Sequence, residues 1–297
     1  MTRHVTHIAM AGDRHVLLGM AVAGRSALEK TSRPLAFEIL GTGFTADDKA
    51  KLIESWQHPM TEGVRFYDVS VSDTKSYRST LYLKSKAAYS RYFIGRITDV
   101  DRIVYIDTDI IVMRDISEAS MIDLEGKTIA AVRDISIRLE PEQPRIINIL
   151  GMKQSKDYFN SGFLIVDMSK WRERGAESGL TQISKDMFDK LDCQDQDALN
   201  IFFEDDVRLL DVSWNTSQYE AVYDIDGVIL HLIGTIKPWL SDYKYHFLDT
   251  FNYWLDRTAY AGVRPVDENT IFAKVNRIIR RIPTLDMLIN KIRKMIL

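Results

Sequence analysis

The chain alternates between two patterns of apolar residues over residues 5–231. Continuous apolar runs are typical of strands buried on both faces, and they occur at residues 5–11, 35–40, 64–69, 103–106, 128–132, 163–166, 207–210 and 228–231. Segments with helical spacing lie between several of these runs, at residues 16–28, 46–56 and 84–97. The alternation predicts an α/β fold with a mostly parallel sheet covered by helices. Residues 140–144, EPEQP, predict an exposed loop.

The end of the chain has a different pattern. In residues 271–297, apolar residues recur at helical spacing on both sides of Pro283, which interrupts any helix. The same segment carries seven Lys or Arg residues and one Asp, a net charge of +6. We therefore predict one domain at residues 1–265 and a basic amphipathic helical tail at residues 266–297. The tail would lie on an anionic membrane surface, or its apolar stripes would pack on the domain or on a second subunit.

Composition narrows the class of protein. The chain has 297 residues, of which 45% are hydrophobic, as expected for a soluble globular protein. The single cysteine, Cys193, excludes an internal disulfide and fits a reducing compartment. The N-terminal residues form no long apolar run, so we expect neither a signal peptide nor a membrane span. The whole chain carries −3 and residues 271–297 carry +6, so the other 270 residues carry −9, which disfavours nucleic-acid binding.

One apolar run ends in two carboxylates. Residues 103–106 are followed directly by Asp107, Thr108 and Asp109. Burying unpaired charge there is costly, so a positive group must lie beside the acids. Side chains at positions i and i+2 of an extended chain point to the same side, and ligands of α/β folds bind beyond the carboxyl ends of strands. The two acids therefore favour a site for a hard divalent metal ion.

The acid pair has two other interpretations. The acids would cap a turn or pair with Arg102 or Arg114 in place of a metal. Haloacid-dehalogenase-like phosphatases also place such a pair after an apolar strand, with Thr or Val two residues after the second acid and close to the N-terminus. Here Ile111 occupies that position and the pair lies far from the N-terminus, which disfavours a phosphatase.

Four further segments carry a family resemblance. They are YSRYFIG at residues 89–95, YFNSGFLIVDMSKW at 158–171, CQDQDALNIFF at 193–203 and HLIGTIKPW at 231–239. With the acid pair, and in this order, they resemble the family 8 glycosyltransferases, which include bacterial lipopolysaccharide and lipooligosaccharide galactosyl- and glucosyltransferases and glycogenin. The resemblance spans roughly residues 8–239. It implies a Rossmann-like GT-A fold, a nucleotide-sugar donor that is usually UDP-linked, and transfer with retention of anomeric configuration.

The resemblance also implies a metal site. Asp107, Asp109 and His231 match the metal ligands of the family, and the implied ion is Mn²⁺, with Mg²⁺ as the alternative. A lone His at the end of an apolar strand is often structural, but Gly234 and Lys237 follow His231 at the spacing of the family. The ion would bridge the diphosphate oxygens and neutralise charge as UDP leaves.

Contacts to the donor are implied in the same way. They are Ala11 and Asp13 for uracil and ribose, Arg91 for sugar and phosphate, Asp134 and Asn160 for the sugar, Lys237 for the diphosphate, and Asp107, Thr108 and Gly234 for the donor as a whole. Lys237 has the alternative of a surface lysine, and Arg91 that of a helix-surface charge paired with Asp99 or Asp101. Asn160 has the alternative of a turn before a strand.

The candidate catalytic residues are Asp195, Gln196 and Asp197. They precede apolar residues at helical spacing, and acids are favoured at a helix N-terminus in any case. By resemblance they lie at the acceptor and the β-face of the donor sugar. An amide is a weak nucleophile, so we favour a same-face mechanism over double displacement. The departing phosphate would take the acceptor proton, Gln196 would stabilise positive charge through its carbonyl, and Asp195 would orient acceptor hydroxyls.

These features together predict a function. We expect a retaining enzyme that moves galactose or glucose from a UDP-sugar to a sugar hydroxyl of a glycan, such as lipopolysaccharide, lipooligosaccharide or another cell-surface glycan. A lipid-linked acceptor and the basic tail would place it in the cytoplasm, at the inner face of a bacterial cytoplasmic membrane. The alternatives are a binding or scaffold protein on a transferase fold and a self-glucosylating primer similar to glycogenin.

Overall fold

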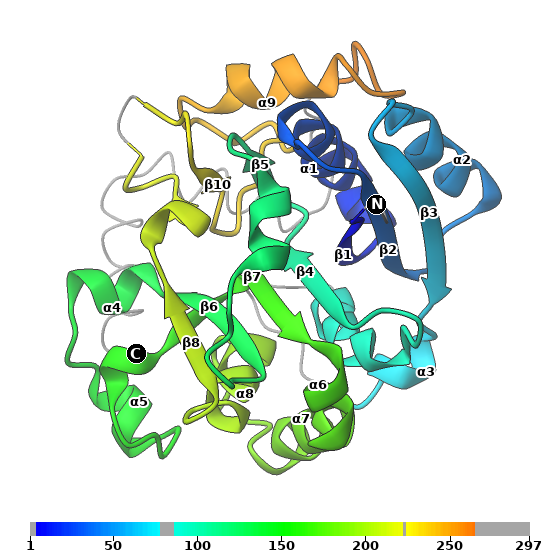
Figure 1. The fold of residues 1–297 in the computed structure, drawn as a ribbon. Coiled ribbons are helices and arrows are strands. Elements are labelled where there is room, and N and C mark those ends of the chain that lie inside the picture. The colour runs from blue at the N-terminus through cyan, green and yellow to red at the C-terminus, as the bar shows by residue number, and fades with distance from the viewer. Residues whose placement is uncertain (1–3, 78–85, 222–223, 265–297) are drawn as a thin grey trace.

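The computed structural model describes residues 4–77, 86–221 and 224–264, so the predicted tail at residues 266–297 lies outside the described residues. A seven-stranded sheet runs through the molecule in the order β3-β2-β1-β4-β7-β6-β8 (Figure 1). Its strands in chain order are β1 (Thr6–Asp13), β2 (Leu35–Thr42), β3 (Thr61–Asp68), β4 (Arg102–Ile106), β6 (Ile129–Arg133), β7 (Phe159–Asp167) and β8 (Val207–Leu210). Seven of the eight apolar runs that predicted strands overlap these strands, and the eighth, at residues 228–231, overlaps β10 (Ile229–His231) of a second sheet, which confirms the α/β prediction.

Most neighbouring strands of this sheet are parallel. Strands β1 to β4 run in one direction, and β6 runs parallel to β8. Strand β7 is antiparallel to both of its neighbours, β4 and β6. It also begins at Phe159, earlier than the predicted run at 163–166, because Asn160, Ser161 and Gly162 interrupt the apolar pattern.

Helices cover both faces of the sheet. In chain order they are α1 (Leu17–Lys30), α2 (Ala46–Ser55), α3 (Val71–Thr74), α4 (Ile135–Leu139), α5 (Pro144–Asn148), α6 (Met168–Glu173), α7 (Ala176–Asp186), α8 (Gln194–Phe202) and α9 (Leu248–Leu255). Ile8 and Met10 of β1 pack with α1 and α2 on one face. Ala9 and Ala11 pack on the other face with α6, α7, α8 and the 3₁₀ helix η2 (Lys86–Arg96). Burial on both faces explains why the strands read as continuous apolar runs.

The predicted helices are confirmed with one change of type. Helix α2 begins where expected because Thr45 accepts from the N–H of Asp48 and the Asp48 carboxylate accepts from the N–H of Thr45. The segment predicted as a helix at 84–97 is a 3₁₀ helix from Lys86, and residues 84–85 lie outside the described part. The loop predicted at 140–144 is mostly exposed and ends at Pro144, where α5 starts.

A second, smaller sheet completes the architecture. It contains β5 (Ile110–Val112), β9 (Thr216–Ser217) and β10 (Ile229–His231), in the order β5-β10-β9. Its apolar residues pack with α1 and α9, which lie side by side at one edge of the molecule (Figure 1). Within residues 4–77, 86–221 and 224–264, no helix is long and apolar enough to cross a membrane.

Candidate active site

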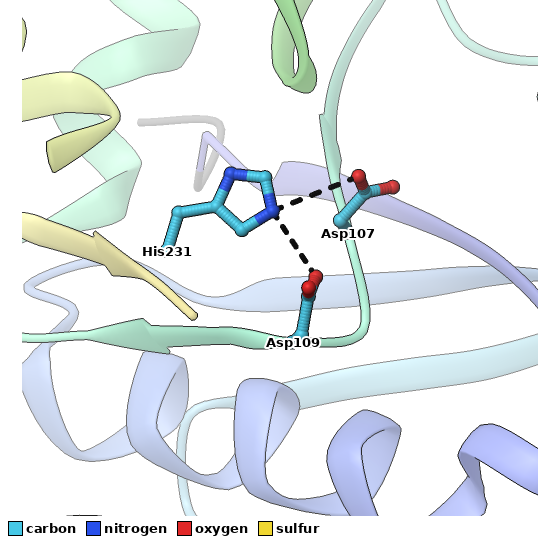
Figure 2. Close-up of side chains that lie close together, drawn as sticks. All are labelled: Asp107, Asp109 and His231. Carbon is cyan, nitrogen blue, oxygen red and sulfur yellow. Dashed lines mark ion pairs between the residues drawn. The ribbon is translucent and has the colours of Figure 1, made fainter. Parts of the chain in front are cut away.

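Asp107, Asp109 and His231 converge where the two sheets meet (Figure 2). Asp107 directly follows β4, and its N–H donates to the carbonyl oxygen of Gly162 on β7 at 2.8 Å. Asp109 directly precedes β5, and the antiparallel pairing of β5 with β10 places Ile110 opposite His231. One oxygen of each carboxylate and a ring nitrogen of His231 lie within 4.8 Å of one another. The predicted metal ligands thus form one cluster.

The two oxygens of Asp107 have different surroundings. Oδ1 accepts hydrogen bonds from Arg91 Nη2 at 2.7 Å and from the Tyr105 hydroxyl at 3.1 Å. Oδ2 lies 3.9 Å from His231 Nε2. One oxygen is therefore bound by protein donors, while the other faces the imidazole and is placed to bind a ligand.

Asp109 repeats this arrangement in a more buried position. Lys237 Nζ hydrogen-bonds to Oδ2, and Oδ1 lies 3.2 Å from His231 Nε2. Burial opposes ionisation of Asp109, but the positive charge of Lys237 and the contact with His231 outweigh it and hold the pKa of the carboxyl well below its ordinary value. Asp109 is therefore a carboxylate at neutral pH, and a lysine compensates its charge.

The donor atoms fit a divalent metal ion. His231 Nδ1 lies 2.9 Å from Asn215 Oδ1, which accepts, so the ring proton is assigned to Nδ1 and Nε2 presents a lone pair. That lone pair faces Asp107 Oδ2 and Asp109 Oδ1, and a cation satisfies three such donors at once. Carboxylate oxygens suit Mn²⁺ and Mg²⁺, and imidazole is compatible with Mn²⁺. These three atoms would hold the ion.

Arg91 lies buried beside the acid pair, not on a helix surface. Its side chain is 6% exposed, and Nε lies 2.8 Å from Asp195 Oδ2. Nη1 donates to the carbonyl oxygen of Ser161 at 2.7 Å, and the guanidinium lies 4.7 Å from the centre of the Tyr105 ring. Because Nη2 is bonded to Asp107, this arginine links the metal ligands to the start of α8.

Three residues predicted near the donor sugar are bonded to one another. Asp134 Oδ2 accepts from Asn160 Nδ2 at 3.1 Å and from Gln196 Nε2 at 3.2 Å. Gln196 Oε1 accepts from Asn160 Nδ2 at 3.2 Å and from the N–H of Ser161 at 3.1 Å. The other oxygen of Asp134 caps α4 through the N–H of Ser136. The cluster joins the ends of β6 and β7 to the first turn of α8.

The two acids that flank position 196 are buried and bonded to the protein. Asp195 pairs with the buried arginine described above. Asp197 accepts from the Tyr158 hydroxyl at 2.6 Å, from the N–H of Cys193 at 2.9 Å and from Arg145 Nη1 at 3.2 Å. These contacts favour a positioning role for both acids, and their predicted catalytic roles stay predictions.

The remaining predicted contacts lie on the edge where the strands end. Ala11 and Asp13 end β1, which runs parallel to β4, so they share the edge that carries the metal ligands. Asp13 accepts from the N–H of His15 at 2.9 Å and so begins a short 3₁₀ helix. Thr108 is buried, and Gly234 has a φ of +109°, which favours glycine.

Two glycines permit close approach at the site. A Cβ on Gly162 would lie 2.2 Å from His231 Cε1, so the imidazole needs the bare backbone of β7. A Cβ on Gly19 of α1 would lie 2.3 Å from the carbonyl oxygen of Thr108. Both positions therefore shape the metal site although neither supplies a ligand.

Sequence reasoning gave no role to Asn215, Tyr158 or Arg145. Each contacts a predicted site residue, namely His231, Gln196 and Asp197. Tyr158 begins one of the family-like segments, whereas Asn215 and Arg145 lie outside all of them. The contacts of these three residues depend on the fold and cannot be predicted from a local sequence pattern.

Comparison with known proteins agrees with this site. The sequence profile described as Glycosyl transferase family 8 matches residues 7–243. Glycosyltransferase GlyF of Streptococcus pneumoniae is 26% identical over 242 residues, which is 78% of this chain but 56% of GlyF. General stress protein A of Bacillus subtilis is 27% identical over 282 residues, or 86% of this chain and 94% of that protein. The lipopolysaccharide 1,3-galactosyltransferase of Salmonella typhimurium is 27% identical over 79% of this chain and 73% of its own length.

Solved structures confirm the GT-A-like fold. The galactosyltransferase LgtC, in complex with donor and acceptor sugar analogues, matches with a TM-score of 0.76 and 21% identity, over 85% of this chain and 96% of LgtC. The apo form of GlyE from Streptococcus pneumoniae matches with a TM-score of 0.63 and 19% identity, over 85% of this chain and 60% of GlyE. With a profile match across most of its length and the fold to accompany it, the chain belongs to glycosyl transferase family 8.

Proposed function

We propose that the protein is a metal-dependent hexosyltransferase that moves galactose or glucose from UDP to a sugar hydroxyl with retention of configuration. The observation that carries the proposal is the convergence of Asp107, Asp109 and His231 within 4.8 Å at the end of β4. A family of retaining glycosyltransferases and a ligand set for a divalent ion are consistent with one another. The intact ligand set argues against a scaffold protein that has lost its chemistry.

The residues around the metal ligands suit a diphosphate. The ion, Mn²⁺ or Mg²⁺, would act as a Lewis acid that neutralises charge on the leaving diphosphate. Lys237 carries a second positive charge beside Asp109. Gly234, in the loop that precedes Lys237, has a backbone conformation that other residues rarely adopt. Arg91 forms ion pairs with Asp107 and Asp195, so we propose that it orients these two side chains.

The surroundings of Gln196 favour the same-face route. Double displacement needs a nucleophile, and the carboxylates on either side of Gln196 are paired with Arg91 and Arg145. The Gln196 carbonyl accepts two hydrogen bonds, from Asn160 and from the backbone of Ser161. A fixed amide dipole beside the sugar would stabilise developing positive charge without forming a bond.

The acceptor is proposed to be a lipid-linked cell-surface glycan. Two relatives are a lipopolysaccharide 1,3-galactosyltransferase of Salmonella typhimurium and a lipopolysaccharide glucosyltransferase of Escherichia coli. The basic, amphipathic sequence of residues 271–297 suits an enzyme held at the inner face of a cytoplasmic membrane. A self-glucosylating primer remains the second candidate for the acceptor.

A donor panel tests the proposal. The purified chain is incubated with UDP-galactose, UDP-glucose and other UDP-hexoses, with Mn²⁺ or with chelator, and UDP release is measured. We expect UDP release from one donor with Mn²⁺ and from none with chelator. When a glycan acceptor is added, we expect NMR of the product to give an α-linkage. Full activity in chelator or a β-linked product contradicts the proposal. Mass spectrometry of the protein after incubation with donor alone separates self-glucosylation from transfer to a glycan.

A further inference from the structure

A continuous chain of side-chain hydrogen bonds runs from the metal ligand His231 into the protein. Its donor and acceptor atoms are His231 Nδ1 to Asn215 Oδ1 at 2.9 Å, Asn215 Nδ2 to Asn160 Oδ1 at 2.9 Å, Asn160 Nδ2 to Gln196 Oε1 at 3.2 Å, Gln196 Nε2 to the Tyr158 hydroxyl at 3.2 Å, and that hydroxyl to Asp197 Oδ1 at 2.6 Å. The chain thus connects the metal site with Gln196.

Backbone groups fix the direction of the first two bonds. The N–H of Gly162 donates to Asn160 Oδ1 at 3.0 Å, so this oxygen is an acceptor. Asn215 must then present its NH₂ group to Asn160, and its oxygen to His231. His231 therefore carries its proton on Nδ1, and the lone pair of Nε2 faces the two carboxylates (Figure 2).

The far end of the chain is fixed in the same way. The N–H of Ser161 donates to Gln196 Oε1 at 3.1 Å, so the NH₂ group of Gln196 faces Tyr158. The Tyr158 hydroxyl accepts this bond and donates to Asp197, which is paired with Arg145 and accepts only. Every bond in the chain therefore donates in one direction, away from the metal ligand.

The backbone sets the position of Asn215. It follows the 3₁₀ helix η5 (Val212–Trp214) and directly precedes β9, which runs parallel to β10 with Ser217 opposite His231. The Asn215 side chain is buried, as is His231. The carboxamide of Asn215 accepts a hydrogen bond from the imidazole and donates one to Asn160 at the same time. An aliphatic side chain or a carboxylate of the same size cannot make both bonds.

We propose that Asn215 is a positioning residue that holds His231 as the Nδ1–H tautomer and couples the metal site to the orientation of Gln196. Hydrogen bonds that donate in one direction polarise one another, so a cation on Nε2 strengthens each bond towards Gln196. The turnover readout of the inference rests on the proposed function, whereas its metal-binding readout does not.

Three variants separate the two halves of this role. Asn215→Asp still accepts from His231 but cannot donate to Asn160, Asn215→Leu does neither, and Tyr158→Phe removes only the far end. Asn148→Asp makes the same chemical change at an exposed position of α5 and serves as the control. For each purified full-length protein, the Kd for Mn²⁺ is measured by calorimetric titration without nucleotide, kcat by release of UDP, and Tm by thermal unfolding.

We expect a different pattern for each variant. Asn215→Leu raises the Kd for Mn²⁺ by about 10- to 100-fold, the usual loss when a partner of a ligating histidine is removed. Asn215→Asp keeps the Kd within about threefold of the original while kcat falls at least about tenfold, because the link to Asn160 is lost. Tyr158→Phe likewise keeps the Kd and lowers kcat, and Asn148→Asp changes neither.

Two results overturn the inference. One is an Asn215→Leu variant, or Asn215→Ala if Leu does not fold, that binds Mn²⁺ as tightly as the original chain. The other is an Asn215→Asp variant with unchanged kcat, or one in which Kd, kcat and Tm worsen together as in a purely structural role. If the original chain releases no hexose from any donor, the proposed function fails, and the Kd contrast between Asn215→Asp and Asn215→Leu still decides the role of Asn215.

Discussion

At the scale of single residues, the site depends on two carboxylates that each use one oxygen for a protein cation and keep the other oxygen facing His231. Asp107 uses one oxygen for Arg91 and Tyr105, and Asp109 uses one for Lys237. Each keeps its other oxygen facing His231. This division explains how two acids are tolerated at the end of a buried strand, because fixed cations offset the desolvation of each carboxylate. It also means that removing one negative charge leaves a buried cation without its partner.

Asp109→Asn tests the division directly. The amide keeps the size of the side chain but removes a charged ligand atom and the partner of Lys237. We expect the affinity for Mn²⁺ to fall by at least about 100-fold, more than for a residue that only supports a ligand, and Mn²⁺-dependent UDP binding to be lost. Calorimetric titration measures both. Asp189→Asn, at an exposed position after α7, is the control, and equal Mn²⁺ affinity in the two variants would exclude Asp109 as a ligand.

Gly162→Ala tests the space that His231 needs. The added Cβ would lie 2.2 Å from His231 Cε1, so the imidazole must move away from β7 and from Asn215. We expect the Kd for Mn²⁺ to rise about tenfold or more, because the ring loses the partner that orients it. Gly63→Ala is the control, since nothing lies within 4 Å of its Cβ position. A Gly162→Ala protein that folds and binds Mn²⁺ normally would refute the contact.

Local patterns predict some of these residues and not others. Asp107, Asp109 and His231 each stand at the end of an apolar run, where polar residues are conspicuous. Asn215 follows no apolar run, and its role depends on contact with His231, which lies 16 positions away on β10. The same holds for Arg145, which reaches Asp197 from 52 positions away. Ligands at strand ends can therefore be predicted from sequence, while the side chains that orient them become visible only in the fold.

At the scale of elements, the buried carboxylate of Glu38 connects edge strand β3 to its neighbours in the sheet by hydrogen bonds. Glu38 of β2 contacts His7 Nδ1 of β1 at 2.8 Å, Arg65 Nε of β3 at 2.9 Å and the Tyr67 hydroxyl of β3 at 3.1 Å. Burial opposes ionisation of Glu38, but its bonds to His7, Arg65 and Tyr67 outweigh it and hold the pKa of the carboxyl below its ordinary value. Glu38 thus stabilises three neighbouring strands as an anion.

Glu38→Gln is expected to weaken this edge of the sheet in a pH-dependent way. At neutral pH we expect the free energy of unfolding to fall by about 2–3 kcal/mol, because charged hydrogen bonds are lost while the half-exposed Arg65 regains water. A lowered folded-state pKa stabilises the fold above the ordinary value of 4.5, and this contribution is lost as the pH falls through that value and then through the lowered one. Denaturant unfolding should show the difference shrinking below pH 4.5.

The matched control for this experiment is Glu62→Gln, an exposed residue on the neighbouring edge strand β3. It should change the free energy of unfolding by less than about 0.5 kcal/mol at any pH, as is usual for surface substitutions. A Glu38→Gln difference that stays constant with pH would mean that packing, and not the charge of Glu38, accounts for the loss.

Element boundaries can be predicted from the sequence where the apolar periodicity is regular. The prediction fails where polar residues lie within a strand. Helix α2 is predicted to within a residue because Thr45 and Asp48 mark its start. Strand β7 is predicted too short, since Asn160, Ser161 and Gly162 look like a turn although they belong to the strand, where Asn160 pairs with Val132 of β6 beyond a register shift. Asn160 and the backbone of Ser161 in that strand bond to Gln196, and Gly162 leaves room for His231. The strand pattern therefore breaks where the candidate site begins.

At the scale of the whole molecule, the site lies where the seven-stranded sheet meets the three-stranded one. Asp107 follows β4 and Asp109 precedes β5, while β1 carries the predicted nucleotide contacts. Asp134 follows β6, β7 contains Asn160, and β10 ends at His231. The family match ends at residue 243, well before the basic residues of the C-terminal segment. We therefore expect that the net charge of +6 in residues 271–297 can be tested without disturbing the catalytic fold.

The tail prediction is tested with charge-reduced protein. Replacing Lys274, Arg277, Arg280 and Arg281 with Gln removes four of the seven positive charges in residues 271–297. Each Lys or Arg near an anionic membrane contributes about 1 kcal/mol, so the binding free energy should fall by about 4 kcal/mol, or nearly a thousandfold in affinity. Sedimentation with anionic liposomes measures binding, and hydrolysis of the UDP-sugar is expected to stay unchanged.

A control with the same change in net charge shows whether the position of the charges matters. Four exposed lysines of the described domain are replaced with Gln instead, at Lys153, Lys156, Lys185 and Lys190. If the tail is the anchor, this variant sediments as the original chain does, because its charges lie outside the amphipathic segment. Equal loss in both variants would indicate attraction by net charge alone. A tail variant that still sediments fully would mean that these four charges do not hold the protein on the membrane, which contradicts the tail prediction.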